Sequence, residues 1–137
     1  MKLLRVAALF AILSLNATLV PAQTPCAPTK HAALPLIYSL TYRKARSRLL
    51  AKGWQPFETI ANNNSDIDVH IRFGNGKLFW DRGYREVENC SGVGLAPCSF
   101  LFQDAYGNRL RVTSSGEEDP KGKYHARVDS YKFVCDE

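Results

Sequence analysis

A histidine, two carboxylates and three arginines are the residues in this chain that resemble a hydrolytic site. A small basic nuclease would use a histidine and a carboxylate as general acid and base, and arginines to bind phosphate. The candidates for these roles are His125, Glu86, Glu88, Arg109, Arg111 and Arg127. Alternation along strands would place Arg109 with Arg111, and His125 with Arg127. The simpler interpretation, which we favour, is the solvated face of an antiparallel sheet.

A second cluster consists of five cations within ten residues and no acid among them: Arg43, Lys44, Arg46, Arg48 and Lys52. Such a run could contact lipid headgroups, envelope polysaccharide or an acidic protein surface. It could equally be the solvated outer face of a helix. Arg46 differs from the others because it falls on the apolar side of that helix, near Tyr42. We expect it either to extend over the rim of the core or to be partly buried and paired with a carboxylate.

The chain has four cysteines, Cys26, Cys90, Cys98 and Cys135, in an even number that suits disulfides in an oxidising compartment. Four cysteines allow three pairings, of which we favour Cys90–Cys98 with Cys26–Cys135. There is no C-x-x-C motif, and no histidine has ligand spacing to a cysteine. We therefore expect neither a metal site nor any other cofactor.

Residues 1–22 have the features of a secretory signal peptide: a short basic start, an apolar stretch and small residues at the cleavage point. We expect cleavage after Ala22, leaving residues 23–137 as a single domain. A membrane anchor is disfavoured because the apolar run is shorter than the roughly 20 residues that span a bilayer. Losing Lys2 and Arg5 lowers the net charge from +5 to +3, too little to indicate nucleic-acid binding.

We expect a helix that is capped by Thr41, ends at Gly53 and presents the basic cluster, with Tyr42, Ala45 and Leu49 on its apolar side. Alternating apolar and polar residues predict a half-buried strand over 66–73. The segment 74–76 is predicted as a turn and 77–80 as a second, weaker strand. Residues 84–90 are ambiguous between strand and irregular structure.

The clearest hairpin is predicted over residues 98–114. A three-residue loop at 105–107, with Gly107 at positive φ, would pair Phe102 with Leu110 and Phe100 with Val112. The last strand starts near Tyr124 and changes phase at 129–130, which predicts a β-bulge. The fold class is therefore α+β: one N-terminal helix packed on an antiparallel meander sheet, stapled by two disulfides.

Several motifs together resemble a family of small secreted bacterial proteins of unknown function. They are Tyr42-x-x-Ala45-Arg46-x-x-Leu49-x-x-x-Gly53-Trp54-Gln55-Pro56, Gly83-Tyr84-Arg85-Glu86-Val87, Cys90-Ser91-Gly92-x-Gly94-x-x-x-Cys98-x-Phe100-x-Phe102-x-Asp104 and Gly107-x-x-Leu110-x-Val112. The resemblance implies a periplasmic or secreted location and brings no catalytic residues. More remotely, the helix ending in Gly-Trp is similar, at fold level only, to modules of periplasmic inhibitors and envelope-assembly factors.

Three functional hypotheses follow. The leading one is a secreted or periplasmic non-enzymatic binding module, such as an inhibitor or immunity-like protein, whose partner is another envelope or secreted protein. The alternatives are a small basic hydrolase or nuclease, and an envelope-surface protein that binds anionic lipid or polysaccharide through the basic helix. The binding residues in the first and third cases would be Arg43, Lys44, Arg48 and Lys52. The sequence leaves the oligomeric state open.

Overall fold

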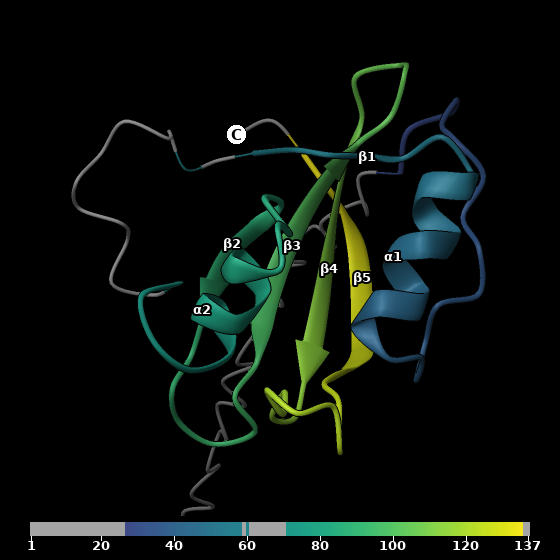
Figure 1. Ribbon diagram of the computed structural model, residues 1–137. Helices are drawn as coiled ribbons and strands as arrows, with labels where there is room; N and C mark the ends of the chain where they lie inside the picture. The colour runs from purple at the N-terminus through teal and green to yellow at the C-terminus, as the bar shows by residue number, and fades with distance from the viewer. Residues whose placement is uncertain (1–26, 59, 61–70, 136–137) are drawn as a thin grey trace, which may run out of the picture.

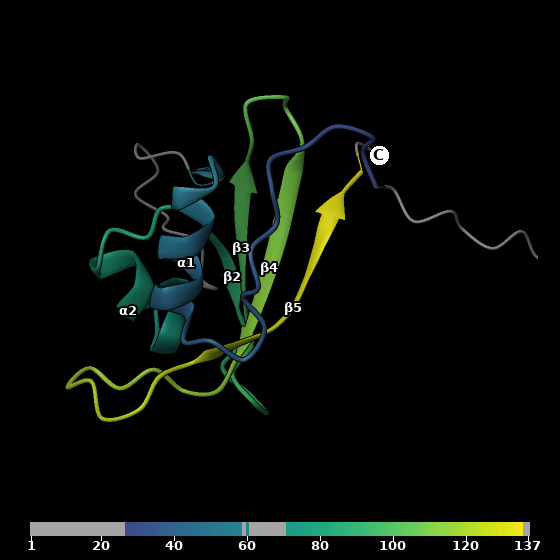
Figure 2. The same cartoon turned by 90° about the vertical axis from the view of Figure 1, so that its right-hand side faces the viewer.

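The computed structural model describes residues 27–58, 60 and 71–135 (Figure 1). These residues form two helices and a five-stranded antiparallel sheet, so the predicted α+β class is confirmed. The elements are α1 (Tyr42–Ala51), β1 (Gln55–Pro56), α2 (Gly74–Asp81), β2 (Val87–Cys90), β3 (Cys98–Gln103), β4 (Arg109–Ser115) and β5 (Arg127–Val134). Both helices lie on the same face of the sheet (Figure 2).

The sheet is a meander from β2 to β5, in which each strand pairs with the next, while β1 shares one edge of β3 with β2. The predicted hairpin register is confirmed, because Phe100 lies opposite Val112 and Phe102 opposite Leu110. Gly107 in its loop has φ +86°. The predicted bulge at 129–130 is confirmed as well. Thr113 lies opposite Ser130 but Ser114 lies opposite Val128, so Asp129 is the extra residue.

The apolar side of α1 fills the space between the helix and the sheet. Tyr42, Ala45 and Leu49 are buried, and the Tyr42 ring stacks on Phe100 with centroids 3.6 Å apart. The hydroxyl of Thr41 does not cap the helix. Instead the Tyr42 N–H donates to Ala126 O at 3.0 Å, so the helix start is fixed by the chain that leads into β5.

The second helix contradicts the sequence-based prediction of a turn at 74–76 followed by a strand at 77–80. The Gly-Asn-Gly triplet forms the first turn of α2. The Asn75 amide is buried there and donates to Gly116 O at 2.9 Å, while its Oδ1 accepts from Glu118 N–H. These contacts with a distant loop, together with burial of Phe79, outweigh the local turn preference.

The strand predicted over 66–73 is wrong where it can be compared. Residues 71–73 are not in a strand, and residues 66–70 lie outside the described part of the chain. Ile71 is nevertheless buried in the core, whereas Phe73 is exposed. The alternating pattern placed both side chains on the inward face, so it was right for Ile71 and wrong for Phe73.

The predicted disulfide between Cys90 and Cys98 is confirmed, and it joins two directly opposite residues of β2 and β3. Cys135 is not a free thiol either. Its predicted partner Cys26 lies outside the described residues, so the second pairing stays a prediction. The proposed signal peptide also lies outside them; within them, no helix is long and apolar enough to cross a membrane.

We expect Cys90→Ser with Cys98→Ser to lower the free energy of unfolding by about 2–3 kcal/mol, because opening this short loop restores chain entropy to the unfolded state. Urea unfolding at neutral pH measures the effect. A change below about 0.5 kcal/mol, the range of neutral surface substitutions, would show that the β2–β3 pairing holds this region without the cross-link.

Asp104 organises the β3–β4 hairpin loop. Its carboxylate accepts hydrogen bonds from the Asn108 side chain and from the backbone N–H groups of Ala32, Asn108 and Tyr106. Burial by itself would raise the pKa of Asp104, but these donors outweigh it and leave the pKa below its ordinary value. The ionised form is therefore favoured in the folded state.

Because of Asp104, we expect the free energy of unfolding to decrease as the pH is lowered. The pKa of Asp104 is lower in the folded state than in the unfolded chain, where it is about 3.9, so the ionised carboxylate stabilises the fold at higher pH. This stabilisation is lost as the pH falls from the unfolded-state pKa toward the folded-state pKa. Asp104→Asn should flatten this part of the profile between about pH 6 and pH 2 in urea titrations. Parallel profiles for the two proteins would contradict the assignment.

Candidate functional site: a cationic cleft

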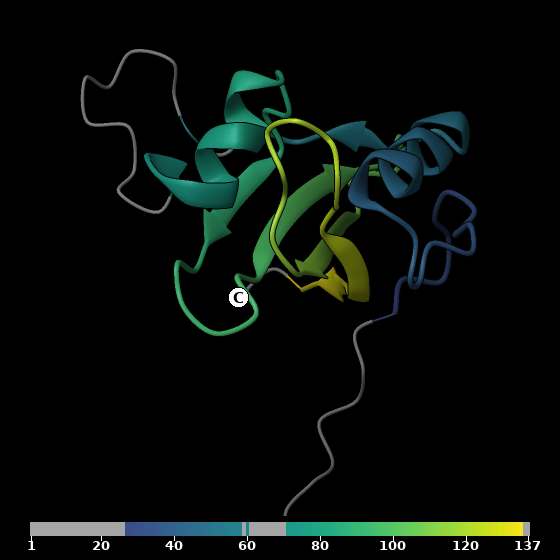
Figure 3. The same cartoon turned by 60° about the horizontal axis from the view of Figure 1, so that its bottom comes forward.

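A cavity of about 700 Å³ opens between the start of α1, the end of α2 and the loop that connects β4 to β5. Figure 3 shows this loop between the two helices. The residues that line the cavity, which we call the cationic cleft, are Thr41, Arg43, Lys44, Phe79, Arg82, Tyr84, Glu118, Pro120, Lys121, Gly122 and His125. Four are permanent cations and one is a carboxylate, so the cleft is strongly electropositive.

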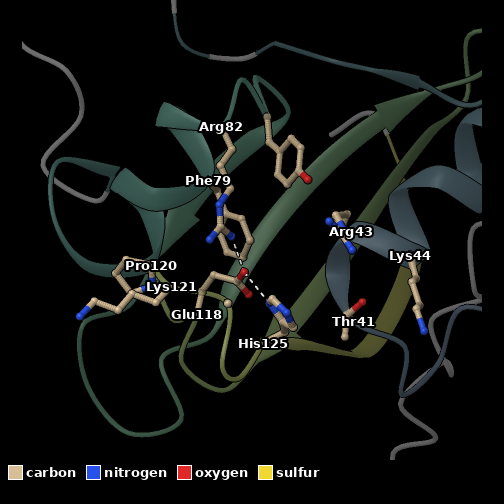
Figure 4. A pocket seen from close by; sticks show the side chains of 11 residues that line it. Thr41, Arg43, Lys44, Phe79, Arg82, Glu118, Pro120, Lys121 and His125 are labelled. Carbon is tan, nitrogen blue, oxygen red and sulfur yellow. Dashed lines mark hydrogen bonds and ion pairs between the residues drawn. The ribbon is translucent and has the colours of Figure 1, made fainter.

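Glu118 is the buried centre of the cleft wall. Its Oε1 accepts from Arg82 Nη1 and lies 2.9 Å from His125 Nδ1, as the dashed lines in Figure 4 show. Its Oε2 accepts from the backbone N–H of Ala126 at 3.0 Å. Glu118 thus joins the end of α2 to the β4–β5 loop, and both of its oxygens already have partners.

The remaining cations have no such partner. The side chains of Arg43, Lys44 and Lys121 make no hydrogen bond or ion pair with any other residue that the structure describes, and all three are exposed. In Figure 4, Arg43 and Lys121 lie on opposite sides of the cleft, with Glu118 and His125 between them. The arrangement leaves three charges available to an anionic ligand.

An ion pair beside the cleft fixes α1 against the sheet. Arg46 Nε donates to Glu86 Oε1 at 2.6 Å, and the Tyr42 hydroxyl donates to the same oxygen at 2.7 Å. Arg46 also lies over the ring of Tyr84, a lining residue, at 4.8 Å. Burial and then the adjacent Glu86 carboxylate raise the pKa of Tyr42 well above its ordinary value, which keeps its hydroxyl protonated as a donor. Arg46 is therefore partly buried and paired.

The residues considered for a nuclease do not converge. Glu86 is buried beneath Arg46, and Arg111 forms a bidentate pair with Glu88 at 2.8 and 3.0 Å. Arg109 lies over the Phe57 ring, and Arg127 donates to Ser39 O. Of the six candidates, His125 is the only one that lines the cleft.

Two of the four cations predicted to bind a partner, Arg43 and Lys44, line the cleft. Arg48 does not line it; it lies one turn beyond Lys44 along α1, and its Nη1 donates to Leu36 O at 2.7 Å. Lys52 follows the end of the helix. Arg82, Glu118 and Lys121 were not identified from the sequence as site residues.

No group of three or more histidine, cysteine, aspartate or glutamate side chains within the described ranges is placed to hold a metal ion. Searches against protein-family models, curated proteins and solved structures found no match.

Proposed function

We propose that this chain is an exported, non-enzymatic binding module whose cationic cleft receives acidic groups of another envelope or secreted protein. The observation that carries the proposal is the set of three unpartnered cations, Arg43, Lys44 and Lys121, around a cavity of about 700 Å³. A volume of this size accommodates several side chains or a small ligand. An inhibitor or immunity-like role is consistent with such a surface.

The electrostatics favour an acidic partner. Exposed ion pairs contribute only about 0–1 kcal/mol each, but several converging charges act together and also accelerate encounter with an oppositely charged surface. The single carboxylate of the cleft does not neutralise this surface, because Glu118 is paired with Arg82 and His125. An incoming carboxylate therefore finds cations that need not first break existing pairs.

The contact between His125 and Glu118 is the one observation that favours the alternative, a hydrolase. A histidine oriented by a carboxylate is typical of general base catalysis. Among the residues that line the cleft, only Thr41 and Tyr84 carry a side-chain hydroxyl, and the contact of the described His125 ring is with Glu118 rather than with either of them. Turnover of a nucleic acid or glycan that is lost in His125→Ala would support the hydrolase over the binding module.

A fluorescently labelled oligoglutamate peptide tests the proposal directly. We expect binding at about 10 mM ionic strength, where the Debye length is about 30 Å, and loss of binding at about 1 M, where it is about 3 Å. Fluorescence anisotropy measures both. Absence of binding at low salt, or binding that is independent of salt, would contradict the proposal.

Export is tested separately, on protein purified from the envelope fraction. Intact-mass spectrometry is expected to find a chain that starts at Gln23, with all four cysteines oxidised. A mass that includes residues 1–22, or four free thiols, would rule out the predicted route and compartment.

A further inference from the structure

Two large apolar side chains are exposed in the segment that leads into α1 and the cationic cleft. Leu36 is 84% exposed and Tyr38 is 70% exposed, although Ile37 between them is completely buried. Thr41, which lines the cleft, follows Tyr38 by only three residues. The Cα atoms of Tyr38 and Thr41 are therefore within about 11 Å of each other, so one ligand could contact both Tyr38 and the cleft.

The turn that carries these side chains is held rigidly in place. Ser39 N–H donates to Val128 O at 2.8 Å and Leu40 N–H donates to Ile37 O at 3.2 Å. Arg48 and Arg127 donate to the carbonyls of Leu36 and Ser39. Ser39 itself has φ +63°, a backbone conformation that costs free energy for a residue other than glycine. The backbone that carries Leu36 and Tyr38 is thus held in one conformation, which lowers the entropy lost on binding.

We propose that Leu36 and Tyr38 are the apolar anchor of a protein-docking surface, and that the segment bound there is acidic and extends into the cationic cleft. This inference rests on the proposed function and specifies its partner. The charge of the surface supports it: residues 27–57 include six cations and not one aspartate or glutamate. Interfaces commonly combine apolar and aromatic anchors with arginine and a charged rim.

The shape of the site favours a protein segment over a membrane. Apolar anchors beside cations also occur in proteins that bind anionic lipid surfaces. A bilayer surface, however, is broad and does not fill a recess of about 700 Å³. An acidic chain segment can bring carboxylates into the recess while its apolar side chains cover Leu36 and Tyr38.

Two synthetic peptides of equal length and charge test this. One contains only glutamate and glycine, and the other has leucine and tryptophan in place of central glycines. We expect the second peptide to bind the wild-type protein about tenfold more tightly. In Leu36→Ser with Tyr38→Ser this gain should disappear, while binding of the glutamate–glycine peptide is unchanged. Both substituted residues are exposed, and thermal unfolding confirms that the variant is folded.

Val93→Ser with Leu95→Ser is the matched control, because these residues are also exposed, at 77% and 74%, but lie in the disulfide loop. This variant should keep the full tenfold gain. The inference is overturned by equal affinity of the two peptides for the wild type, or by equal losses in the two variants. It is also overturned if the two peptides bind equally and Leu36→Ser with Tyr38→Ser instead abolishes binding to anionic vesicles, which would make the surface a membrane site. Dissociation of a dimer by the same variant, again with equal peptide binding, would make it a contact between two copies of this chain. Failure of the glutamate–glycine peptide to bind at all would instead reject the proposed function.

Discussion

Arg46→Ala is expected to lower the free energy of unfolding by about 3 kcal/mol, the largest effect on stability that we predict for a side chain outside the apolar core. The substitution leaves the Glu86 carboxylate buried without a cation. Glu86 is completely buried, and among the described residues its Oε2 has no hydrogen-bond partner. Arg46 is 23% exposed, so we place the effect at the lower end of the range for breaking a buried pair.

Lys77→Ala is the control for this experiment. Lys77 and Asp81 are also in salt-bridge contact, at 2.5 Å, but both side chains are more than half exposed on one face of α2. An exposed pair of this kind contributes about 0.3–0.5 kcal/mol. Urea unfolding of the two variants measures the difference. Equal losses would mean that Glu86 does not depend on Arg46, and that the pair does not fix α1 against the sheet.

Reversal of three charges in the cleft is expected to have the largest effect on binding. Arg43→Glu, Lys44→Glu and Lys121→Glu together should weaken binding of the oligoglutamate peptide by at least about a hundredfold. Each substitution removes an attraction and adds a repulsion, and about 1 kcal/mol for each position already gives this factor. None of the three residues has a partner in the described structure, so the variant should retain its fold.

A control with the same change in net charge separates the cleft from the protein as a whole. Lys30, Lys52 and Lys132 are exposed and do not line the cleft. Their simultaneous substitution by glutamate should weaken binding by less than about tenfold, through long-range electrostatics alone. If this control weakens binding as much as the cleft variant does, attraction depends on total charge and the cleft is not the site.

In the β3–β4 hairpin and in α1, local patterns predicted the structure correctly. The alternation of Phe100 and Phe102 with their partners, together with Gly107, specified one hairpin register, since a slip of one residue would turn every apolar side chain outward. The position of Arg46 on the apolar side of α1 led to two alternatives, of which the ion pair with Glu86 is found. The short Cys90–Cys98 spacing suggested its disulfide on similar local grounds.

Where structure depends on distant contacts, the sequence did not predict it. The Gly74-Asn75-Gly76 triplet has the composition of a turn, but Asn75 hydrogen-bonds to residues some forty positions away and the segment becomes helical. The cleft also depends on contacts between segments that are distant in the sequence. Arg82 follows α2, whereas Glu118 and Lys121 belong to the β4–β5 loop, and no periodicity relates such segments. Arg43 and Lys44 were identified because a helix makes their spacing informative.

The most direct test of the cationic cleft is to titrate the isotopically labelled protein with the oligoglutamate peptide and follow its amide resonances by NMR. We expect the largest chemical-shift changes at Arg43, Lys44, Arg82, Lys121 and His125, at the start of α1, the end of α2 and the β4–β5 loop. Changes concentrated instead around Arg109 and Lys132, or spread evenly over all cations, would contradict the account.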